Sequence, residues 1–240
     1  MTPYSNTLLE ICVDSPASAA AAEEGGANRI ELCADLSVGG TTPSAGIIAN
    51  TRENVELPIH VMIRPHGGWR ITDIDFEVMK YDIVHAKYLG IDGIVTGILT
   101  HDHAIDVLRM AELIKIAKPL SVTFHRAFDY VPDHEAALNQ LVELGVERVL
   151  TAGGHGNAPG NIEPLRRIVA LAGHRIHILV GGGLTIETIG QVRAQTKARE
   201  LHMLSAVTNP VLHDREGSVF PGRRIVDADK VRQARAALMM

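Results

Sequence analysis

Eight short apolar runs, nearly all separated by helix-like segments, constrain the fold of this 240-residue chain more than any other feature. The runs are typical of buried strands, and apolar residues recur at helical spacing in the segments between them. Strands that alternate with helices form a parallel sheet covered by those helices. Eight such units predict an α/β protein, a single-domain (β/α)8 TIM barrel over residues 1–240.

The expected element boundaries follow from turn and capping residues. Ser15 and Pro16 begin the first helix and Gly25 ends it, because serine caps helices, proline suits the first turn and glycine suits the end. An open doubly wound sheet is the alternative, but its glycine-rich dinucleotide fingerprint is absent after the first strand. We expect strands at 8–14, 29–34, 58–64, 93–98, 120–125, 148–151, 175–180 and 200–205, and helices at 16–24, 43–54, 76–89, 105–118, 133–144, 162–171, 185–195 and 229–238.

Charge and composition exclude several classes of function. The net charge is -5 and no basic cluster is longer than Arg223-Arg224, so nucleic acid and anionic membranes are not expected partners. The segment Met1–Thr7 lacks the features of a signal peptide, and no apolar run approaches membrane-spanning length. We therefore expect a cytoplasmic protein, in which cysteines remain thiols.

Two short motifs near the N-terminus repeat one pattern. Glu10-Ile11-Cys12 and Glu31-Leu32-Cys33 each place an acid, a branched apolar residue and a cysteine in a strand-like run, and these are the only two cysteines of the chain. Side chains alternate between the two faces of a strand, so the thiols and carboxylates share one face. If the two strands are parallel neighbours, two thiols and two carboxylates converge on one small region.

The predicted strands carry one apolar face and one polar face. The apolar face suits contact with the outer helices, whereas barrel interiors are usually filled with branched apolar residues. Ionisable groups there must be paired or functional. An internal ion-pair network and a functional site both remain open for deep residues such as Glu10 and Glu31. The polar face holds Glu10, Cys12, Asp14, Glu31, Cys33, His60, Met62, Arg64, Ser121, Thr123, His125, His177 and His202.

Several motifs resemble those of the CutC copper homeostasis family. They are Glu10–Ser15, Gly25–Cys33, Gly39-Gly40, Thr42–Ser44, Met62–Pro65, Gly67-Gly68, Val122–Asp129 and Gly181–Gly183, in this order. The resemblance extends from about residue 9 to 206 and leaves 207–240 as a C-terminal extension with a closing helix. It implies a cytosolic TIM barrel that forms a homo-oligomer and binds Cu(I) at Cys12 and Cys33.

The copper interpretation agrees with the chemistry of the cysteines. Cu(I) is a soft ion that prefers thiolate and thioether ligands. Neighbouring strands lie about 4.8 Å apart, which two cysteine side chains span through one metal ion. Met62 would add a thioether, or His125 an imidazole. The alternative is simple packing, because cysteine is among the most buried residue types.

An enzyme is the rival interpretation. Gly181, Gly182 and Gly183 follow the seventh strand, where barrels often bind phosphate, and Thr185 caps the next helix. This pattern favours a small anionic or phosphorylated substrate at the carboxyl-terminal mouth. The alternative is that the glycines only form a tight turn.

Four polar residues are the candidate catalytic groups of such an enzyme. Glu31 and His125 suit acid and base roles, Arg64 suits an anion, and Glu10 lies beside them on the polar face. Arg126 would also suit an anion, although its place in the alternation points it outward, toward a helix or loop. An internal Arg64–Glu31 ion pair is the competing explanation for that arginine.

Overall fold

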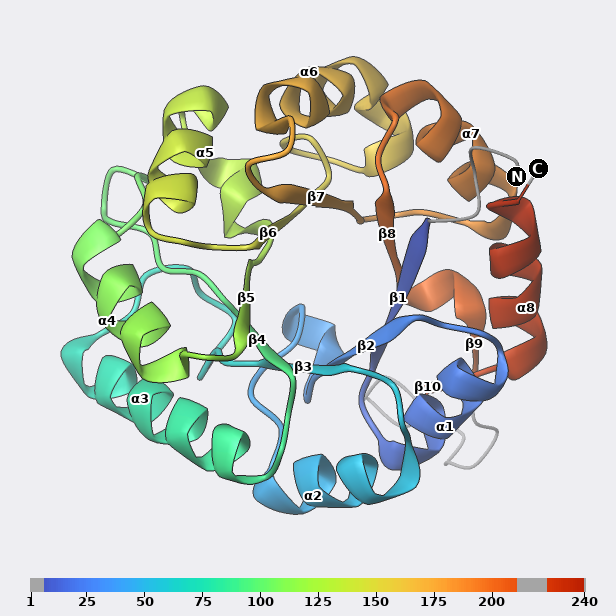
Figure 1. Ribbon diagram of the computed structural model, residues 1–240, viewed down its shortest axis with the longest axis horizontal. Coiled ribbons are helices and arrows are strands. Elements are labelled where there is room, and N and C mark those ends of the chain that lie inside the picture. Colours follow the sequence, from blue (N-terminus) through green and yellow to red (C-terminus); the bar gives the residue numbers. More distant parts are fainter. Residues whose placement is uncertain (1–6, 211–223, 240) are drawn as a thin grey trace, which may run out of the picture.

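Eight parallel strands close into a barrel in the computed structural model, which describes residues 7–210 and 224–239 (Figure 1). Each strand pairs with the next and β8 pairs with β1, which confirms the TIM barrel and excludes the open sheet. Arg223 and part of the expected C-terminal extension lie outside the described residues. The strands are β1 (Leu8–Val13), β2 (Arg29–Leu32), β3 (Ile59–Met62), β4 (Gly93–Thr96), β5 (Ser121–Phe124), β6 (Arg148–Thr151), β7 (His177–Val180) and β8 (Glu200–Met203).

A helix follows each strand on the outside of the barrel. The first helix has the expected bounds, 16–24, and the other helices differ from the expected bounds by one to three residues at one or both ends. For example, Ser44 accepts a hydrogen bond from Ile47 N, so the second helix begins at Ala45. The helices are α1 (Pro16–Glu24), α2 (Ala45–Asn54), α3 (Asp73–Tyr88), α4 (Val107–Ala117), α5 (His134–Glu143), α6 (Ile162–Ala172), α7 (Ile186–Thr196) and α8 (Ala228–Ala237).

Most strands end earlier than their sequence pattern predicts. β2 ends at Leu32 and β3 at Met62, so Cys33 and Arg64 lie just beyond the paired segments. β1 ends at Val13, and Asp14 lines a cavity together with Ser18 and Arg224. Two short strands, β9 (Thr208–Pro210) and β10 (Arg224–Val226), were not expected because three residues carry no periodicity; they pair antiparallel. Helix α8 closes the ring between α1 and α7.

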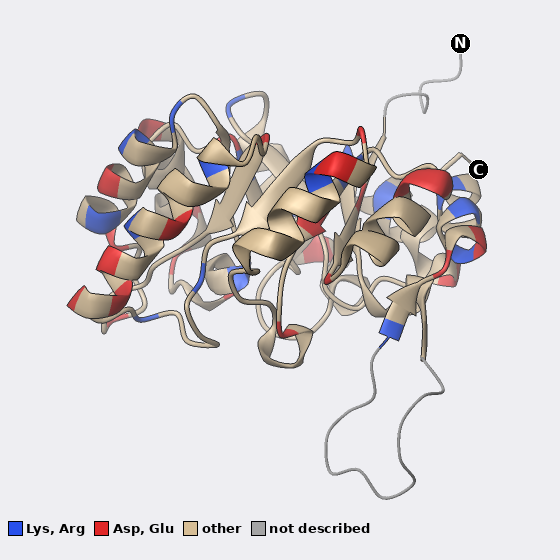
Figure 2. Ribbon diagram, turned by 90° about the horizontal axis from the view of Figure 1, so that it is seen from below, with Lys and Arg blue, Asp and Glu red and all other residues tan. Residues whose placement is uncertain are grey.

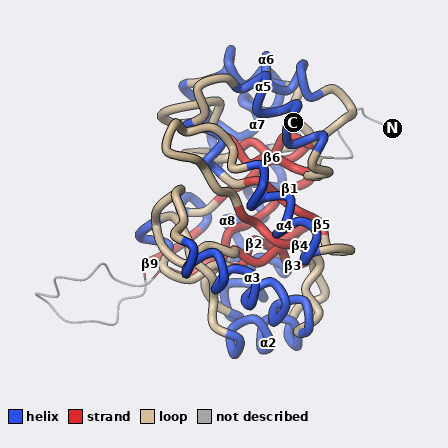
Figure 3. The backbone as a smooth tube through the Cα atoms, turned by 90° about the vertical axis from the view of Figure 1, so that its left-hand side faces the viewer, coloured by secondary structure: helices blue, strands red, loops and turns tan. Residues whose placement is uncertain are grey.

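Two separate apolar clusters reflect the two faces of the strands. The larger one lies between strands and helices and includes Ile11, Leu32 and Phe124, as the sequence pattern predicts. The smaller one, Cys12, Cys33, Met62 and Val95, lies within the barrel. Figure 3 shows the strands at the centre, with helices on both sides.

The outer surface carries mixed charge. In the edge-on view of Figure 2, Lys and Arg are interspersed with Asp and Glu on the outer helices. None of the helices in the described ranges is long and apolar enough to cross a membrane.

Candidate functional site

An ion-pair network occupies the amino-terminal half of the barrel interior. Arg29 on β2 contacts Glu10 at 2.5 Å and Glu200 at 2.8 Å, and Arg148 on β6 contacts Glu200 at 2.6 Å. All four residues are buried. Burial would raise the pKa of Glu10, but Arg29 and His202 outweigh it and hold that pKa well below its usual range. Glu10 is therefore an ionised member of an internal ion-pair network, which was one of the two interpretations open for it.

His202 on β8 connects this network to the cysteines. Its Nδ1 lies 2.8 Å from Glu10 Oε1, and its Nε2 lies 3.8 Å from Glu31 Oε2. Burial would lower the pKa of His202, but Glu31, Cys12 and Glu10 outweigh it and raise that pKa well above its usual value. Nδ1 of His202 is thus held by the Glu10 carboxylate, and Nε2 faces the Glu31 carboxylate.

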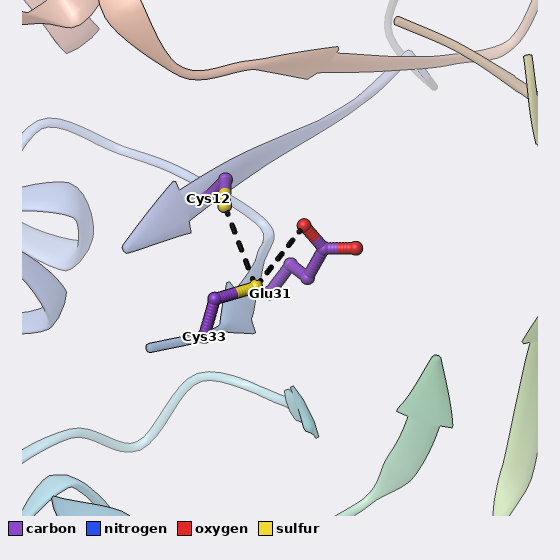
Figure 4. Close-up of side chains that lie close together, drawn as sticks. All are labelled: Cys12, Glu31 and Cys33. Carbon is purple, nitrogen blue, oxygen red and sulfur yellow. Dashed lines mark hydrogen bonds between the residues drawn. The ribbon is translucent and has the colours of Figure 1, made fainter. Parts of the chain in front are cut away.

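The two thiols are adjacent and face the barrel interior. Cys12 Sγ lies 3.7 Å from Cys33 Sγ, which lies 3.7 Å from Glu31 Oε2 (Figure 4). The register explains this contact, because Cys12 pairs with Glu31 across β1 and β2 and Cys33 follows two residues later. The convergence expected from the repeated motifs is therefore observed.

Both thiols resist ionisation. The hydrogen bond to Cys33, burial and the charge of Glu31 raise the pKa of Cys12 well above its usual value. For Cys33 the hydrogen bond from Cys12 has the opposite effect, but burial and Glu31 outweigh it and raise the pKa to about 11. Without a metal ion, the pair is therefore protonated at neutral pH.

Glu31 has one oxygen without a partner. Its Oε1 is buried and makes no hydrogen bond to any described residue, while Oε2 faces Cys33 and His202. Burial raises the pKa of Glu31, although His202 opposes this effect. Two overlapping sets of possible metal ligands share this residue: Cys12, Glu31 and Cys33, and also Glu10, Glu31 and His202.

The thiol pair also has apolar neighbours. Met62 and Val95 pack with both cysteines in one buried cluster. Gly40 approaches the pair closely, since its φ is +92° and an added Cβ would lie 3.0 Å from Cys33 Sγ. The thiols thus have a thioether neighbour as well as a carboxylate neighbour.

A cavity of about 560 Å³ opens above this cluster, at the carboxyl-terminal ends of the strands. We call it the mouth cavity. Its size is typical of a small-molecule site. Its polar and aromatic lining includes Cys12, Glu31, Arg64, Trp69, His125, Arg126, Tyr130 and His202.

Arg64 lines the mouth cavity. It does not form the ion pair with Glu31 that was one of the two expected roles of this arginine. Its guanidinium instead donates to backbone carbonyls and stacks over Trp69, with Cζ 4.3 Å from the ring centroid. Sequence patterns do not reveal this arrangement, because loops after β2 and β3 supply the acceptors. These are the carbonyl oxygens of Val38, Gly40, Gly67 and Gly68.

His125 presents an unpartnered ring nitrogen in the cavity wall. Ala127 N donates to its Nδ1 at 3.3 Å, so the neutral ring carries its proton on Nε2. That Nε2 is buried and has no partner among the described residues. Burial, with a contribution from Arg64, lowers the pKa of His125 to about 3. His125 is therefore a neutral donor at physiological pH.

The glycine triplet after β7 forms part of the same wall. Gly182 and Gly183 line the cavity, and their amides donate to no described residue, whereas Gly181 N donates to Thr151 O. Thr185 caps α7 as expected. An added Cβ at Gly182 would lie 3.1 Å from Arg126 Cζ.

Arg126 faces the mouth cavity, which corrects the outward direction that strand alternation predicted. The alternation stops because β5 ends at Phe124 and Arg126 begins the 3-10 helix Arg126–Tyr130. The expected bonding partner in a loop is nevertheless present, since Arg126 Nη2 donates to Gly156 O at 3.3 Å. Its Nε also lies 2.8 Å from Asp129 Oδ2.

Comparison with known proteins identifies the family. The model of the CutC family matches residues 7–207. The chain belongs to the CutC family. A human relative, a copper homeostasis protein cutC homolog, is 43% identical over 240 residues, covering 95% of this chain and 88% of the relative. A CutC family protein of Sinorhizobium medicae is 40% identical over 235 residues, covering 96% of each chain.

A solved structure agrees with the family assignment. The crystal structure of a CutC protein assigned to copper homeostasis, from Streptococcus agalactiae, superposes with a TM-score of 0.78 at 35% identity. The match covers 82% of this chain and 97% of that chain. The barrel of this CutC family member is therefore shared with an experimentally determined relative.

Most of the site residues expected from the sequence meet at the carboxyl-terminal end of the barrel. Cys12, Glu31, Arg64, His125, Gly182 and Gly183 line the mouth cavity; Cys33 lies directly behind Cys12, and Glu10 belongs to the ion-pair network. Sequence reasoning missed Trp69 and the paired charges of Arg29, Arg148 and Glu200. Strand alternation could have found the charges, because Arg29 shares a face with Glu31. Trp69 lies in a loop without periodicity.

Proposed function

We propose that this protein binds Cu(I) through the thiolates of Cys12 and Cys33 and serves copper homeostasis in the cytoplasm. The main support is the 3.7 Å separation of the two buried Sγ atoms. Met62 packs against both thiols and offers a thioether as a third soft ligand. The names of the relatives support the same role. The reducing cytoplasm keeps both thiols available.

Copper binding must displace the thiol protons. Because both pKa values are raised, Cu(I) competes with protons for the sulfurs, and affinity increases with pH. The burial that opposes ionisation also keeps water and oxidants from the bound ion. The site therefore suits retention of Cu(I) more than rapid exchange.

An anaerobic titration against a Cu(I) chelator tests this proposal. We expect about one Cu(I) per chain in the wild type and loss of this binding in the Cys12→Ser, Cys33→Ser double variant. Met62→Leu should weaken binding by a smaller factor. Met79→Leu is the matched control, because Met79 is equally buried but lies in the outer core. Equal affinity in wild type and the double cysteine variant would disprove the site.

We also propose that the protein forms a homo-oligomer through α3. One face of this helix exposes Ile74, Val78, Tyr81, Val84 and Tyr88, with exposed fractions of 42% to 88%. A continuous apolar stripe of this kind is typical of an interface, and a second copy covers it by two-fold symmetry. Light scattering on wild type and Tyr81→Glu should show a larger mass for the wild type. Equal monomer masses would exclude the proposal.

A second candidate function is catalysis on a small anionic or phosphorylated substrate. The specific observation is that the amides of Gly182 and Gly183 lack described partners and lie beside Arg126 in the mouth cavity. These donors suit an anionic group, while His125 Nε2 and Glu31 Oε1 would contact the remainder of the substrate.

Thermal-shift titration with inorganic phosphate and a small sugar phosphate tests this candidate. We expect stabilisation of the wild type and a much smaller shift in Arg126→Ala. Arg166→Ala is the control, since that arginine is exposed and Glu163 is its ion-pair partner among the described residues. Arg64→Ala is less informative, because its loss releases the carbonyls that Arg64 holds. Absence of any shift in the wild type would remove this candidate.

A further inference from the structure

The thiol pair is accompanied by two different kinds of additional ligand. Met62 lies with the cysteines in an apolar cluster, which suits Cu(I). Glu31 contacts Cys33, and His202 contacts Glu31, but neither polar group is needed for Cu(I) bound by two thiolates and a thioether. These two polar groups therefore call for a different explanation.

Four potential ligand groups form a continuous chain of contacts. The Sγ atoms of Cys12 and Cys33 lie 3.7 Å apart, Cys33 Sγ lies 3.7 Å from Glu31 Oε2, and Glu31 Oε2 lies 3.8 Å from His202 Nε2. The side chains come from β1, the end of β2 and β8, so the barrel backbone holds them together.

These separations match a tetrahedral ion. Two thiolates bound tetrahedrally at about 2.3 Å from Zn²⁺ lie about 3.8 Å apart. A linear two-coordinate ion would place the sulfurs two full bond lengths apart, which exceeds the observed 3.7 Å, so Cu(I) at this pair needs Met62 as its third ligand. Glu31 already lies within 4.8 Å of both thiols, and it also groups with His202. A shared ion therefore requires the His202 ring to move toward the thiols, because nitrogen binds zinc at only about 2.0–2.1 Å.

Glu10 orients His202 in the way that a carboxylate, bonded to one ring nitrogen, orients a histidine whose other nitrogen binds a metal. Glu10 Oε1 accepts from His202 Nδ1 at 2.8 Å, which leaves Nε2 directed to the side of Glu31. Arg29 in turn fixes Glu10. A histidine that only filled space would not need a buried, doubly supported carboxylate at this nitrogen.

Charge favours a divalent ion over a monovalent one at the full ligand set. With two thiolates and the Glu31 carboxylate as ligands, Zn²⁺ leaves one net negative charge in the buried site, whereas Cu(I) leaves two. Thiolate, imidazole and carboxylate are all established zinc ligands.

We propose that the two cysteines, together with Glu31 and His202, form a four-coordinate site for Zn²⁺. The site shares its thiolates with the proposed Cu(I) site but uses different additional ligands. Metal binding replaces the thiol protons and requires neutral His202, so protons are released to the solvent. Each metal excludes the other, because both need the same two sulfurs.

Parallel titrations with Zn²⁺ and Cu(I) distinguish the two ligand sets. We expect Glu31→Gln and His202→Gln to weaken Zn²⁺ binding by at least about tenfold and to leave Cu(I) binding nearly unchanged. Met62→Leu should weaken Cu(I) binding and leave Zn²⁺ binding nearly unchanged. Cys12→Ser should abolish the binding of both Zn²⁺ and Cu(I). His60→Gln is the control for His202→Gln, because this change also removes a buried histidine from the barrel interior, but His60 is not one of the four proposed ligands.

Zinc X-ray absorption on the loaded wild-type protein provides a test that needs no variant. The expected first shell contains two sulfur and two nitrogen or oxygen ligands. Failure of the wild type to bind Zn²⁺, a different first shell, or unchanged Zn²⁺ affinity in both folded variants would overturn the proposal. A wild-type protein that binds Zn²⁺ but not Cu(I) would contradict the proposed copper function and leave the proposed zinc site supported.

Discussion

Glu10 Oε1 lies 2.8 Å from His202 Nδ1, while Glu10 Oε2 lies 2.5 Å from Arg29 Nε. One buried carboxylate thus neutralises a guanidinium and orients an imidazole. Removing its charge leaves both groups inadequately compensated in a barrel interior.

Glu10→Gln should therefore reduce the free energy of unfolding by about 3–5 kcal/mol. Urea denaturation at neutral pH measures this loss. Glu163→Gln is the control, because Glu163 pairs with Arg166 on the surface and should change stability by less than about 1 kcal/mol. A loss below about 1 kcal/mol in Glu10→Gln would show that the network is not structurally required.

Acid should destabilise the protein through its buried neutral histidines. Burial, with Arg29, lowers the pKa of His60 to about 3, and burial, with Arg64, does the same for His125. Below the unfolded value of about 6.5 the unfolded chain binds protons that the folded chain does not. Stability from each histidine is thus complete above that value and is lost as the pH falls toward 3.

Between about pH 7 and pH 5 each histidine should account for about 2 kcal/mol of lost stability. Urea denaturation at the two pH values measures this loss in wild type, His60→Gln and the exposed-site control His174→Gln. The pH-dependent loss should shrink in His60→Gln and remain in the control. An unchanged loss in His60→Gln would contradict the assignment.

Gly93 on β4 makes room for His60 of the neighbouring strand. A Cβ at Gly93 would lie 2.6 Å from the His60 ring, so Gly93→Ala should destabilise the protein by about 1–3 kcal/mol. The cost should shrink when His60→Ala is combined with it, which a double-mutant cycle measures. Gly46→Ala is the control, since its nearest neighbour would be 3.9 Å away. Strictly additive effects would refute the steric explanation.

The cysteines should react slowly in the folded protein. Because the pKa of Cys33 is about 11 and both thiols are buried, few thiolates are accessible near neutral pH. Alkylation by iodoacetamide should be at least about a hundredfold slower in buffer than in urea. Reaction rates that are equal in both conditions would contradict the buried, protonated state of the pair.

Local sequence patterns determined the architecture and much of the site. Eight strand runs, caps such as Ser15 and the alternation that turns Cys12 and Cys33 inward all depend on neighbouring residues, whose spacing fixes which face a side chain occupies. The barrel then follows, because strands separated by helices pair in parallel and in order. The meeting of both thiols and Glu31 was predictable for the same reason.

Contacts made by loops and contacts across the barrel could not be predicted from local sequence patterns. Arg64 binds four loop carbonyls, Arg126 turns into the cavity after β5 ends, and Trp69 stacks on Arg64 from a loop. The contact between His202 and Glu10 joins residues 192 positions apart in sequence. Within the strands, the sequence alone determined which residues face the interior, because strand alternation is local. Only the tertiary structure decided which of them meet, because closure of β8 on β1 brings the ends of the chain together.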